Sequence, residues 1–182
     1  GTVDMVVATY SITDERAERV DFVGPYFIAG QGLLVPEDNT DINGPDDLDG
    51  KLLCSVTGST PAQRIQEEYS EGAQLQEYDT YSNCIEALGT GVIDAVTTDD
   101  IILAGYAAQS ENVGNMKLVG EAFSEENYGI GLPMESGMCE DVAAAVTQMI
   151  DDGSWEQFVA DNVGETGYEP NAALNPPTPE AC

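Results

Sequence analysis

The chain has 182 residues and a formal net charge of −29, from 34 Asp and Glu against 5 Lys and Arg, with no His. This charge excludes the basic surface that nucleic-acid binding requires and disfavours contact with an anionic membrane surface. It favours solubility first, and it also fits a salty or extracytoplasmic setting. The lack of histidine excludes His-based catalytic triads, His-ligated metals and imidazole proton shuttles. The length suits one domain or two small lobes, and 42% hydrophobic residues indicate a folded chain.

The N-terminal part predicts short elements separated by turns. Residues 3–8 form a β-branched apolar run, which predicts a buried strand. Thr13 then caps a short acidic helical start at Asp14. The pair Gly24-Pro25 predicts a break, and residues 32–36 predict a second strand ended by proline. A polar, turn-rich stretch follows, with a helical turn expected at residues 45–48.

The middle of the chain alternates strands and helices. Strands are expected at residues 52–56 and 92–97. The run Thr60-Pro61-Ala62-Gln63 has the form of a capping box with proline at the first helical position, so a helix is expected over residues 61–69. Further helices are expected at residues 83–88 and from Thr98 or Asp99 to residue 108.

The C-terminal part predicts two strands, two helices and a proline-rich tail. The strands are expected at residues 117–119 and 128–132, and apolar residues at helical spacing predict a helix over 142–150, ended by Gly153. Ser154 opens a second capping box and helix. The alternation along the whole chain indicates an α/β fold with parallel sheets, which bind ligands at the carboxyl ends of their strands.

Four cysteines, at positions 54, 84, 139 and 182, are widely spaced and form no C-x-x-C pair. Zinc sites use closely spaced pairs, so no metal site is expected. An even number of cysteines in an acidic chain favours two disulfides and an oxidising compartment over four buried thiols, with three connectivities open. No apolar run approaches the length of a membrane helix, and the chain starts without a signal peptide, so we expect an export signal that is removed or lies outside this chain.

Three strand-to-helix junctions carry the candidate binding residues. The first, residues 11–16, places the hydroxyls of Ser11 and Thr13 beside Arg16, whose planar fork can bind a carboxylate through two charge-assisted hydrogen bonds. A surface ion pair of Arg16 is the alternative interpretation. The second, residues 57–61, presents amides at a helix start that suit an anion or form a plain cap.

The third junction places Asp99 and Asp100 after a strand, where one carboxylate can hold an ammonium group or both can cap the helix. Two anion sites and one cation site together match a zwitterion such as an α-amino acid. No phosphate-loop motif, cofactor-binding motif or nucleophile–base pair is visible in the sequence, so neither a cofactor nor a catalytic residue is expected.

The same residues carry a resemblance to a known family. The chain resembles the polar amino-acid branch of the extracellular solute-binding proteins of ABC importers, and within it the actinobacterial glutamate-binding lipoproteins. The most specific segment is Thr13-Asp14-Glu15-Arg16 with the following Gly24-Pro25-Tyr26. The other similar segments are residues 1–4, 8–12, 20–23, 55–60, 91–96, 128–132 and 176–182.

The resemblance implies a type II periplasmic-binding-protein-like fold of two lobes joined by a hinge, with lobe 1 incomplete because family members begin with a further segment. Residues 1–34 would form part of lobe 1, residues 35–125 lobe 2, and residues 126–182 the return to lobe 1 with the tail. The hinge strands would lie near Leu34 and Tyr128. Since Cys54 and Cys84 then share lobe 2, and Cys139 and Cys182 share lobe 1, the implied disulfides are Cys54–Cys84 and Cys139–Cys182.

The resemblance also implies the ligand contacts. Arg16 would grip the α-carboxylate, with Ser11 and Thr13 alongside, and Thr60 with the Ser59 amide would meet it from lobe 2. Asp99 would take the α-ammonium, assisted by the carbonyl of Thr9 or Ser11. Arg64 would meet a side-chain carboxylate.

The implied function is capture of a polar or acidic amino acid, glutamate favoured, in the inter-lobe cleft and its delivery to the permease subunits of an ABC importer. The protein would sit at the cell surface with a lipid anchor, and its incomplete lobe 1 would expose a surface for chain association. Two alternatives remain open: an amino-acid-sensing ectodomain, and a cyclohexadienyl-dehydratase-like enzyme on the same fold.

Overall fold

The computed structural model describes residues 2–69 and 71–182, so Gly1, at the start of the expected lobe 1 segment, lies outside it. The strands are β1 (Val6–Ser11), β2 (Val20–Ala29), β3 (Gln31–Pro36), β4 (Leu52–Val56), β5 (Gln74–Tyr78), β6 (Ala95–Asp99), β7 (Met116–Val119) and β8 (Glu126–Pro133). The α-helices are α1 (Asp14–Ala17), α2 (Thr60–Arg64), α3 (Tyr81–Gly89), α4 (Asp100–Ala107), α5 (Cys139–Asp151) and α6 (Ser154–Val163). A π-helical turn, Ile65–Tyr69, continues α2, and 3-10 turns lie at Pro45–Asp47 and Gly164–Thr166.

The chain divides into two compact units. Unit 1 contains Gly1–Ala29 and Glu125–Cys182, and unit 2 contains Gly30–Ser124. Strand β3 belongs to unit 2 because it pairs with β6 and β7 there. Residues 30–34 therefore lie in unit 2 and not in the N-terminal segment to which the sequence assigns them.

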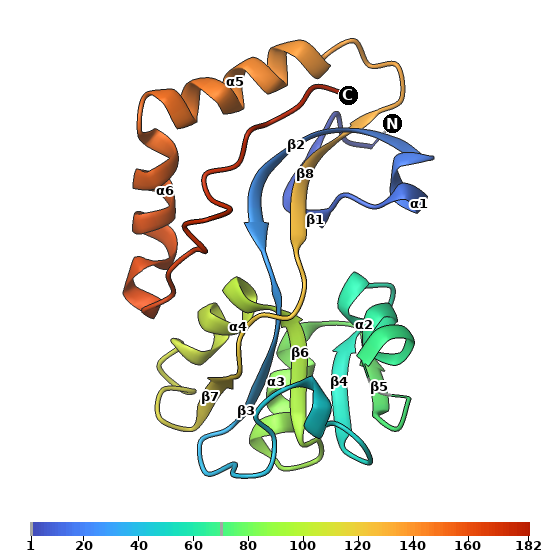
Figure 1. Cartoon of the computed structure of the whole chain (residues 1–182), viewed down its shortest axis with the longest axis vertical. Helices are drawn as coiled ribbons and strands as arrows, with labels where there is room; N and C mark the ends of the chain where they lie inside the picture. Colours follow the sequence, from blue (N-terminus) through green and yellow to red (C-terminus); the bar gives the residue numbers. More distant parts are fainter. Residues whose placement is uncertain (1, 70) are drawn as a thin grey trace. The chain divides into compact units, whose positions relative to one another are not determined.

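Unit 1 is built on an antiparallel sheet with the strand order β1-β8-β2, covered by α5 (Figure 1). Its core joins Val23, Ile130 and Leu132 of the sheet with Val146 of α5. Trp155, at the start of α6, stacks on Phe27 and donates a hydrogen bond from Nε1 to the carbonyl oxygen of Tyr26 over 2.8 Å. These contacts fix both C-terminal helices to the strands.

The expectation of parallel sheets is wrong for unit 1, because β8 lies between β1 and β2 and is antiparallel to both, so no two neighbouring strands of this sheet are parallel. The expected break at Gly24-Pro25 is also wrong, since β2 runs through it with a shift of register between Val23 and Phe27. Gly24 is required there: a Cβ would lie 3.0 Å from the Cα of Gly129. Strand β1 begins three residues later than predicted, because pairing with β8 starts at Val6. The prediction that this strand is buried is also wrong, since the first four residues of β1 are exposed.

Unit 2 is a mixed sheet with the order β5-β4-β6-β3-β7, in which β4 is parallel to β5 and β6 while β3 is antiparallel to β6 and β7. Its apolar side chains alternate between two faces, as strand geometry requires. On one face Leu34 and Val96 pack with α3 and α4 residues such as Leu103. On the other, Leu33 and Leu53 pack with Ile65 and the loop before β4.

Three local predictions in this and the following region need correction. Strand β5 was not expected, because its sequence is polar and mostly exposed, and only parallel pairing with β4 defines it. The cap of α2 is Ser59, whose Oγ accepts from Ala62 N, rather than Thr60. Helix α6 has Gly153 at its N-cap, and the Ser154 hydroxyl donates to Asp152 and Met149 instead of capping.

The structure contains the disulfides Cys54–Cys84 and Cys139–Cys182, the pairing that the resemblance implies. Cys54 and Cys84 are fully buried between β4 and α3, whereas Cys182 is exposed at the end of the tail. No helix in the described part of the chain combines the length and apolar character needed to cross a membrane.

Candidate functional site

The first half-site is the junction between β1 and α1. Thr13 caps α1, as predicted: its backbone is extended at φ −135° and its Oγ1 accepts from Arg16 N over 3.2 Å. The half-buried Arg16 side chain turns back on the strand, and its Nη1 donates to the carbonyl oxygen of Ser11 over 2.8 Å. The guanidinium lies over the ring of Tyr10, 4.9 Å from its centroid.

Arg16 has no acidic partner among the described side chains, where no carboxylate oxygen approaches its nitrogens within 4.0 Å. Its neighbour Arg19 behaves differently: this side chain is 78% exposed and pairs with Glu15 at 3.8 Å. In a chain with 34 acids, an arginine that is oriented by a carbonyl and an aromatic ring but kept from carboxylates is suited to bind an incoming anion.

Ser11 and Thr9 occupy different environments in β1. Ser11 is buried, 3% exposed, and its Oγ donates to Glu126 Oε2 over 2.7 Å. Thr9 is exposed and lies where the register between β1 and β8 shifts, between Val7 and Ser11. The Ser11 carbonyl already accepts a hydrogen bond from Arg16 Nη1.

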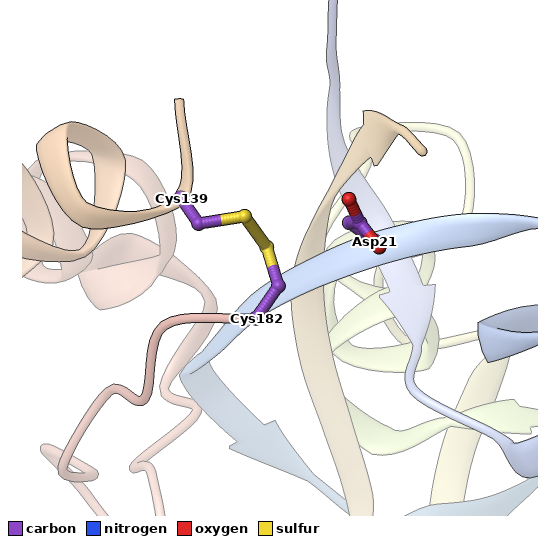
Figure 2. Close-up of side chains that lie close together, drawn as sticks. All are labelled: Asp21, Cys139 and Cys182. Carbon is purple, nitrogen blue, oxygen red and sulfur yellow. A yellow bond between two sulfur atoms is a disulfide. The ribbon is translucent and has the colours of Figure 1, made fainter. Parts of the chain in front are cut away.

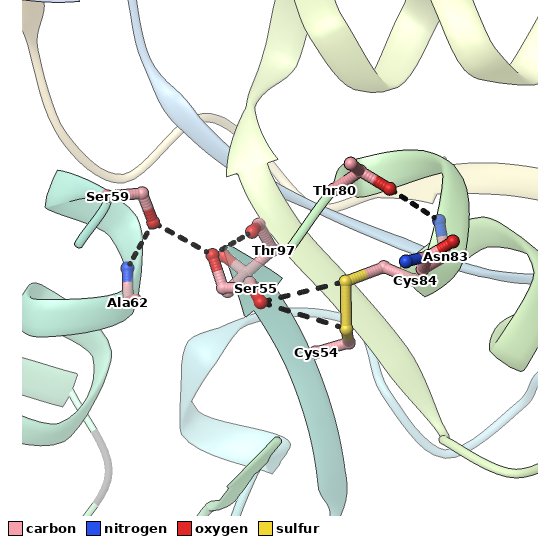
Figure 3. Close-up of a disulfide and its surroundings, with 8 residues drawn as sticks. All are labelled: Cys54, Ser55, Ser59, Ala62, Thr80, Asn83, Cys84 and Thr97. Carbon is pink, nitrogen blue, oxygen red and sulfur yellow. Dashed lines mark hydrogen bonds between the residues drawn. A yellow bond between two sulfur atoms is a disulfide. The ribbon is translucent and has the colours of Figure 1, made fainter. Parts of the chain in front are cut away.

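The second half-site, in unit 2, is the loop between β4 and α2 (Figure 3). The Ser59 hydroxyl lies 3.2 Å from the Ser55 hydroxyl, which donates to the carbonyl oxygen of Thr97 over 2.9 Å. The Ser59 N–H donates to the carbonyl oxygen of Val56. The Ser59 amide is therefore bound within the loop in this structure, and Thr60, the first residue of α2, carries the hydroxyl at the helix start.

The third junction separates the two neighbouring acids. Asp99 ends β6, is 4% exposed and pairs in register with Gln31. Asp100 Oδ1 accepts from the backbone N–H groups of Gly30 and Ile101, so Asp100 stabilises the start of α4. Asp99 is the N-cap residue of α4, but its side chain makes no capping hydrogen bond.

Arg64, in the last turn of α2, has a side chain that is 22% exposed, with its Nε 3.8 Å from Glu68 Oε2. This ion pair offsets part of its charge, so the structure gives Arg64 less capacity for a ligand carboxylate than Arg16 has.

One cluster of metal-ligand atom types was found among the described residues: Asp21 with Cys139 and Cys182, all within 4.8 Å (Figure 2). Both sulfurs belong to a disulfide, and metals bind the thiolate form. Asp21 Oδ2 accepts a hydrogen bond from Glu135 N. We therefore interpret this cluster as an acid that packs beside the Cys139–Cys182 disulfide and not as a metal site.

Sequence reasoning missed two residues of the first half-site, Tyr10 and Glu126. Tyr10 directly precedes Ser11 in the sequence, but no sequence pattern predicts that Arg16 stacks on its ring. That contact depends on how the chain folds back between β1 and α1. Glu126 lies 115 residues from Ser11, so no local pattern relates the two.

Residues 1–165 match the family of bacterial extracellular solute-binding proteins, family 3. The glutamate-binding protein GluB of Corynebacterium efficiens is 51% identical over 170 residues, which are 91% of this chain and 58% of that protein. The ABC transporter glutamine-binding protein GlnH of Bacillus subtilis is 37% identical over 160 residues, 87% of this chain and 57% of that protein. The chain therefore spans little more than half the length of these curated relatives.

Two solved structures agree with the sequence comparison. An ancestral arginine-binding protein bound to glutamine matches with a TM-score of 0.82 and 35% identity, over 90% of this chain and 72% of that one. The GluR0 ligand-binding core from Nostoc punctiforme, in complex with L-glutamate, matches with a TM-score of 0.79 and 32% identity, over 88% and 73%. These matches confirm the expected α/β fold of the type II periplasmic-binding-protein kind.

Proposed function

Because the chain belongs to the bacterial extracellular solute-binding proteins of family 3, we propose that it binds a polar or acidic amino acid, with glutamate favoured, for uptake by an ABC importer. The preference for glutamate is supported by the 51% identity to a glutamate-binding protein. The relatives and solved neighbours also include proteins named for glutamine and arginine, which share the α-amino acid group with glutamate.

The observation that carries this proposal is the environment of the Arg16 guanidinium. It contacts the Ser11 carbonyl and the Tyr10 ring, and no carboxylate of the described residues lies within ion-pair distance of it. Arg16 would bind the ligand α-carboxylate through two charge-assisted hydrogen bonds, with Ser11 and Thr13 shaping the junction. Thr60 and the Ser59 amide would donate to the same carboxylate. Asp99 would bind the ammonium group, with the Thr9 carbonyl as a second acceptor.

Arg64 is the proposed contact for a side-chain carboxylate, in exchange for its ion pair with Glu68. This contact would favour glutamate or aspartate over glutamine, because only the acids offer a second negative charge to the guanidinium.

The partners follow from the same proposal. A binding protein of an ABC importer delivers its ligand to permease subunits, and the name of the Bacillus subtilis relative supports this role. We place the protein at the outer face of the cell, with a lipid anchor, in keeping with its two disulfides and its extracellular family.

A second candidate function is an amino-acid-sensing ectodomain, which the likeness to the GluR0 ligand-binding core supports. Both functions use the same ligand site. The gene neighbourhood separates them: adjacent permease and ATPase genes support transport, and a channel or kinase segment in the same reading frame supports sensing.

Chain association through β1 is a further part of the proposal. Among the described residues β1 pairs only with β8, and Val3, Met5, Val6 and Val7 are 40–61% exposed beside an apolar groove of about 460 Å³. A free strand edge with exposed aliphatic side chains favours pairing with another copy of the chain.

The test is calorimetric titration of the full-length protein with L-glutamate, L-aspartate, L-glutamine and L-arginine. Saturable binding with L-glutamate tightest supports the proposal. Binding of none of the four would reject it.

A further inference from the structure

Glu126 is a buried acid to which the proposed ligand contacts give no role. Its side chain is 1% exposed, and it is the first residue of β8, where it pairs with Ala29 at the end of β2. A buried carboxyl group lowers the stability of the fold unless hydrogen bonds compensate for lost hydration. Its hydrogen-bond partners therefore indicate what this residue does.

One residue links Glu126 to Arg16. The Ser11 hydroxyl donates to Glu126 Oε2 over 2.7 Å, and the carbonyl oxygen of the same serine accepts from Arg16 Nη1 over 2.8 Å. Ser11 is thus held by its side chain and in turn holds the guanidinium by its backbone. All three residues belong to unit 1.

The backbone around Ser11 makes this link important for the position of Arg16. The register between β1 and β8 shifts between Val7 and Ser11, and Ser11, the last residue of β1, pairs with Tyr128. The next residue, Ile12, donates its N–H to the carbonyl oxygen of Asn127 over 2.8 Å. The bond to Glu126 therefore restrains the side chain of a residue that lies at the end of an irregular stretch.

We propose that Glu126 is a positioning residue for amino-acid binding: through Ser11 it holds the Arg16 guanidinium in the orientation that receives a carboxylate. This inference rests on the proposed role of Arg16. A two-pronged contact requires the planar fork to be aligned, and alignment before binding reduces the entropy that binding costs. Glu126 itself does not touch the ligand.

The test is a double-mutant cycle on the full-length protein, with L-glutamate as the probe in calorimetric titrations and a melting temperature for each variant. Glu126→Ala is expected to weaken binding about five- to tenfold. Glu126→Gln, whose amide oxygen still accepts from the Ser11 hydroxyl, is expected to restore affinity to within about twofold. In the Arg16→Ala background, Glu126→Ala is expected to cause no further loss.

Ser11→Ala gives an independent route if Glu126→Ala does not fold. It removes the hydroxyl but keeps the carbonyl that Arg16 uses, and it is expected to weaken L-glutamate binding to the same degree as Glu126→Ala. Trp155→Phe is the matched control, because it removes a different, partly buried hydrogen bond of unit 1, from Trp155 Nε1 to the carbonyl oxygen of Tyr26. This control is expected to lower the melting temperature and leave affinity unchanged.

A ligand comparison separates positioning from general stability. The α-amide of glutamate lacks the α-carboxylate that Arg16 would bind. Glu126→Ala is therefore expected to leave the weak affinity of the protein for this amide unchanged. If Arg16→Ala weakens L-glutamate binding but Glu126→Ala and Ser11→Ala do not, or if their losses add to that of Arg16→Ala, only the role of Glu126 is overturned. If Arg16→Ala has no effect on L-glutamate binding, the proposed ligand site and this inference both fall.

Discussion

The guanidinium carbon of Arg16 lies 4.9 Å from the centroid of the Tyr10 ring. Tyr10 also packs on Phe22, with ring centroids 4.9 Å apart, so contacts with both Arg16 and Phe22 restrain the Tyr10 ring. A cation over an aromatic face is stabilised by the ring quadrupole while its N–H groups remain available at the edge. The stacking therefore orients Arg16 without occupying the groups that a carboxylate needs.

Replacing the ring tests this relationship. Tyr10→Leu is expected to weaken L-glutamate binding about two- to fivefold, the value of an exposed cation–π contact of about 0.5–1 kcal/mol. Tyr10→Phe keeps the ring and is expected to bind like the wild type. Calorimetric titration measures both, and equal affinity of the Leu and Phe variants would show that the ring does not contribute.

The tyrosine at position 26 predicts a pH dependence of stability. Burial raises the pKa of Tyr26 from its ordinary value of 10.0 to about 12. Because the folded state holds this proton more tightly than the unfolded chain, its contribution to stability is complete below about pH 10 and is lost as the pH rises towards 12. Urea unfolding between pH 9 and 12 is expected to show a fall in the unfolding free energy of the wild type relative to Tyr26→Phe.

This prediction would be contradicted if the difference in unfolding free energy between wild type and Tyr26→Phe stayed constant from pH 9 to 12. A constant offset is expected from the hydrogen bond that the Tyr26 hydroxyl donates to Ala8, and only the pH-dependent part reports the titration.

The two disulfides are expected to differ in their reactivity towards reductants. Cys54 and Cys84 are fully buried, whereas Cys182 is exposed, so a reductant under native conditions is expected to open Cys139–Cys182 first. On the chain-entropy model each bridge contributes about 3–4 kcal/mol of stability. Alkylation followed by peptide mapping identifies the order, and earlier labelling of Cys54 would contradict it.

Association through β1 is expected to depend on the apolar edge and on salt. We expect the chain to form a concentration-dependent dimer in sedimentation velocity. Val7 is 59% exposed at the proposed interface, and Val7→Lys is expected to prevent this dimer. Val113→Lys, at a 63% exposed position of unit 2, is the matched control. Because each copy carries a charge of −29, screening by salt is expected to strengthen the dimer. Identical sedimentation of the Val7 and Val113 variants would reject this interface.

Much of the fold follows from sequence patterns, and the exceptions have physical causes. The apolar strands of unit 2 were predictable because both faces of its sheet are covered, as Leu33 and Leu34 show by packing into opposite cores. Strand β5 was not predictable, because an exposed edge strand does not require an apolar pattern of side chains. The full length of β2 was hidden because Gly24-Pro25 reads as a break where the strand contains a bulge.

The candidate site divides in the same way. Thr13 as a cap and Arg16 beside it were predictable, since capping depends on residues within one turn. Ser59 as the cap of α2 was not distinguished from Thr60, because two adjacent hydroxyls fit the same pattern. The bond from Ser11 to Glu126 joins strands that are distant in the sequence, so it required the folded chain.

The comparison of Arg16→Ala with Arg19→Ala tests the central claim most directly. Both variants remove one positive charge from the same short segment, but Arg19 is 78% exposed and paired with Glu15, whereas Arg16 is oriented by Ser11 and Tyr10. Hydrogen bonds to a charged group are worth about 1.5–3 kcal/mol each, so Arg16→Ala is expected to weaken L-glutamate binding about ten- to a thousandfold, with little change for Arg19→Ala. Equal L-glutamate affinity of the two variants in calorimetric titration would contradict the account.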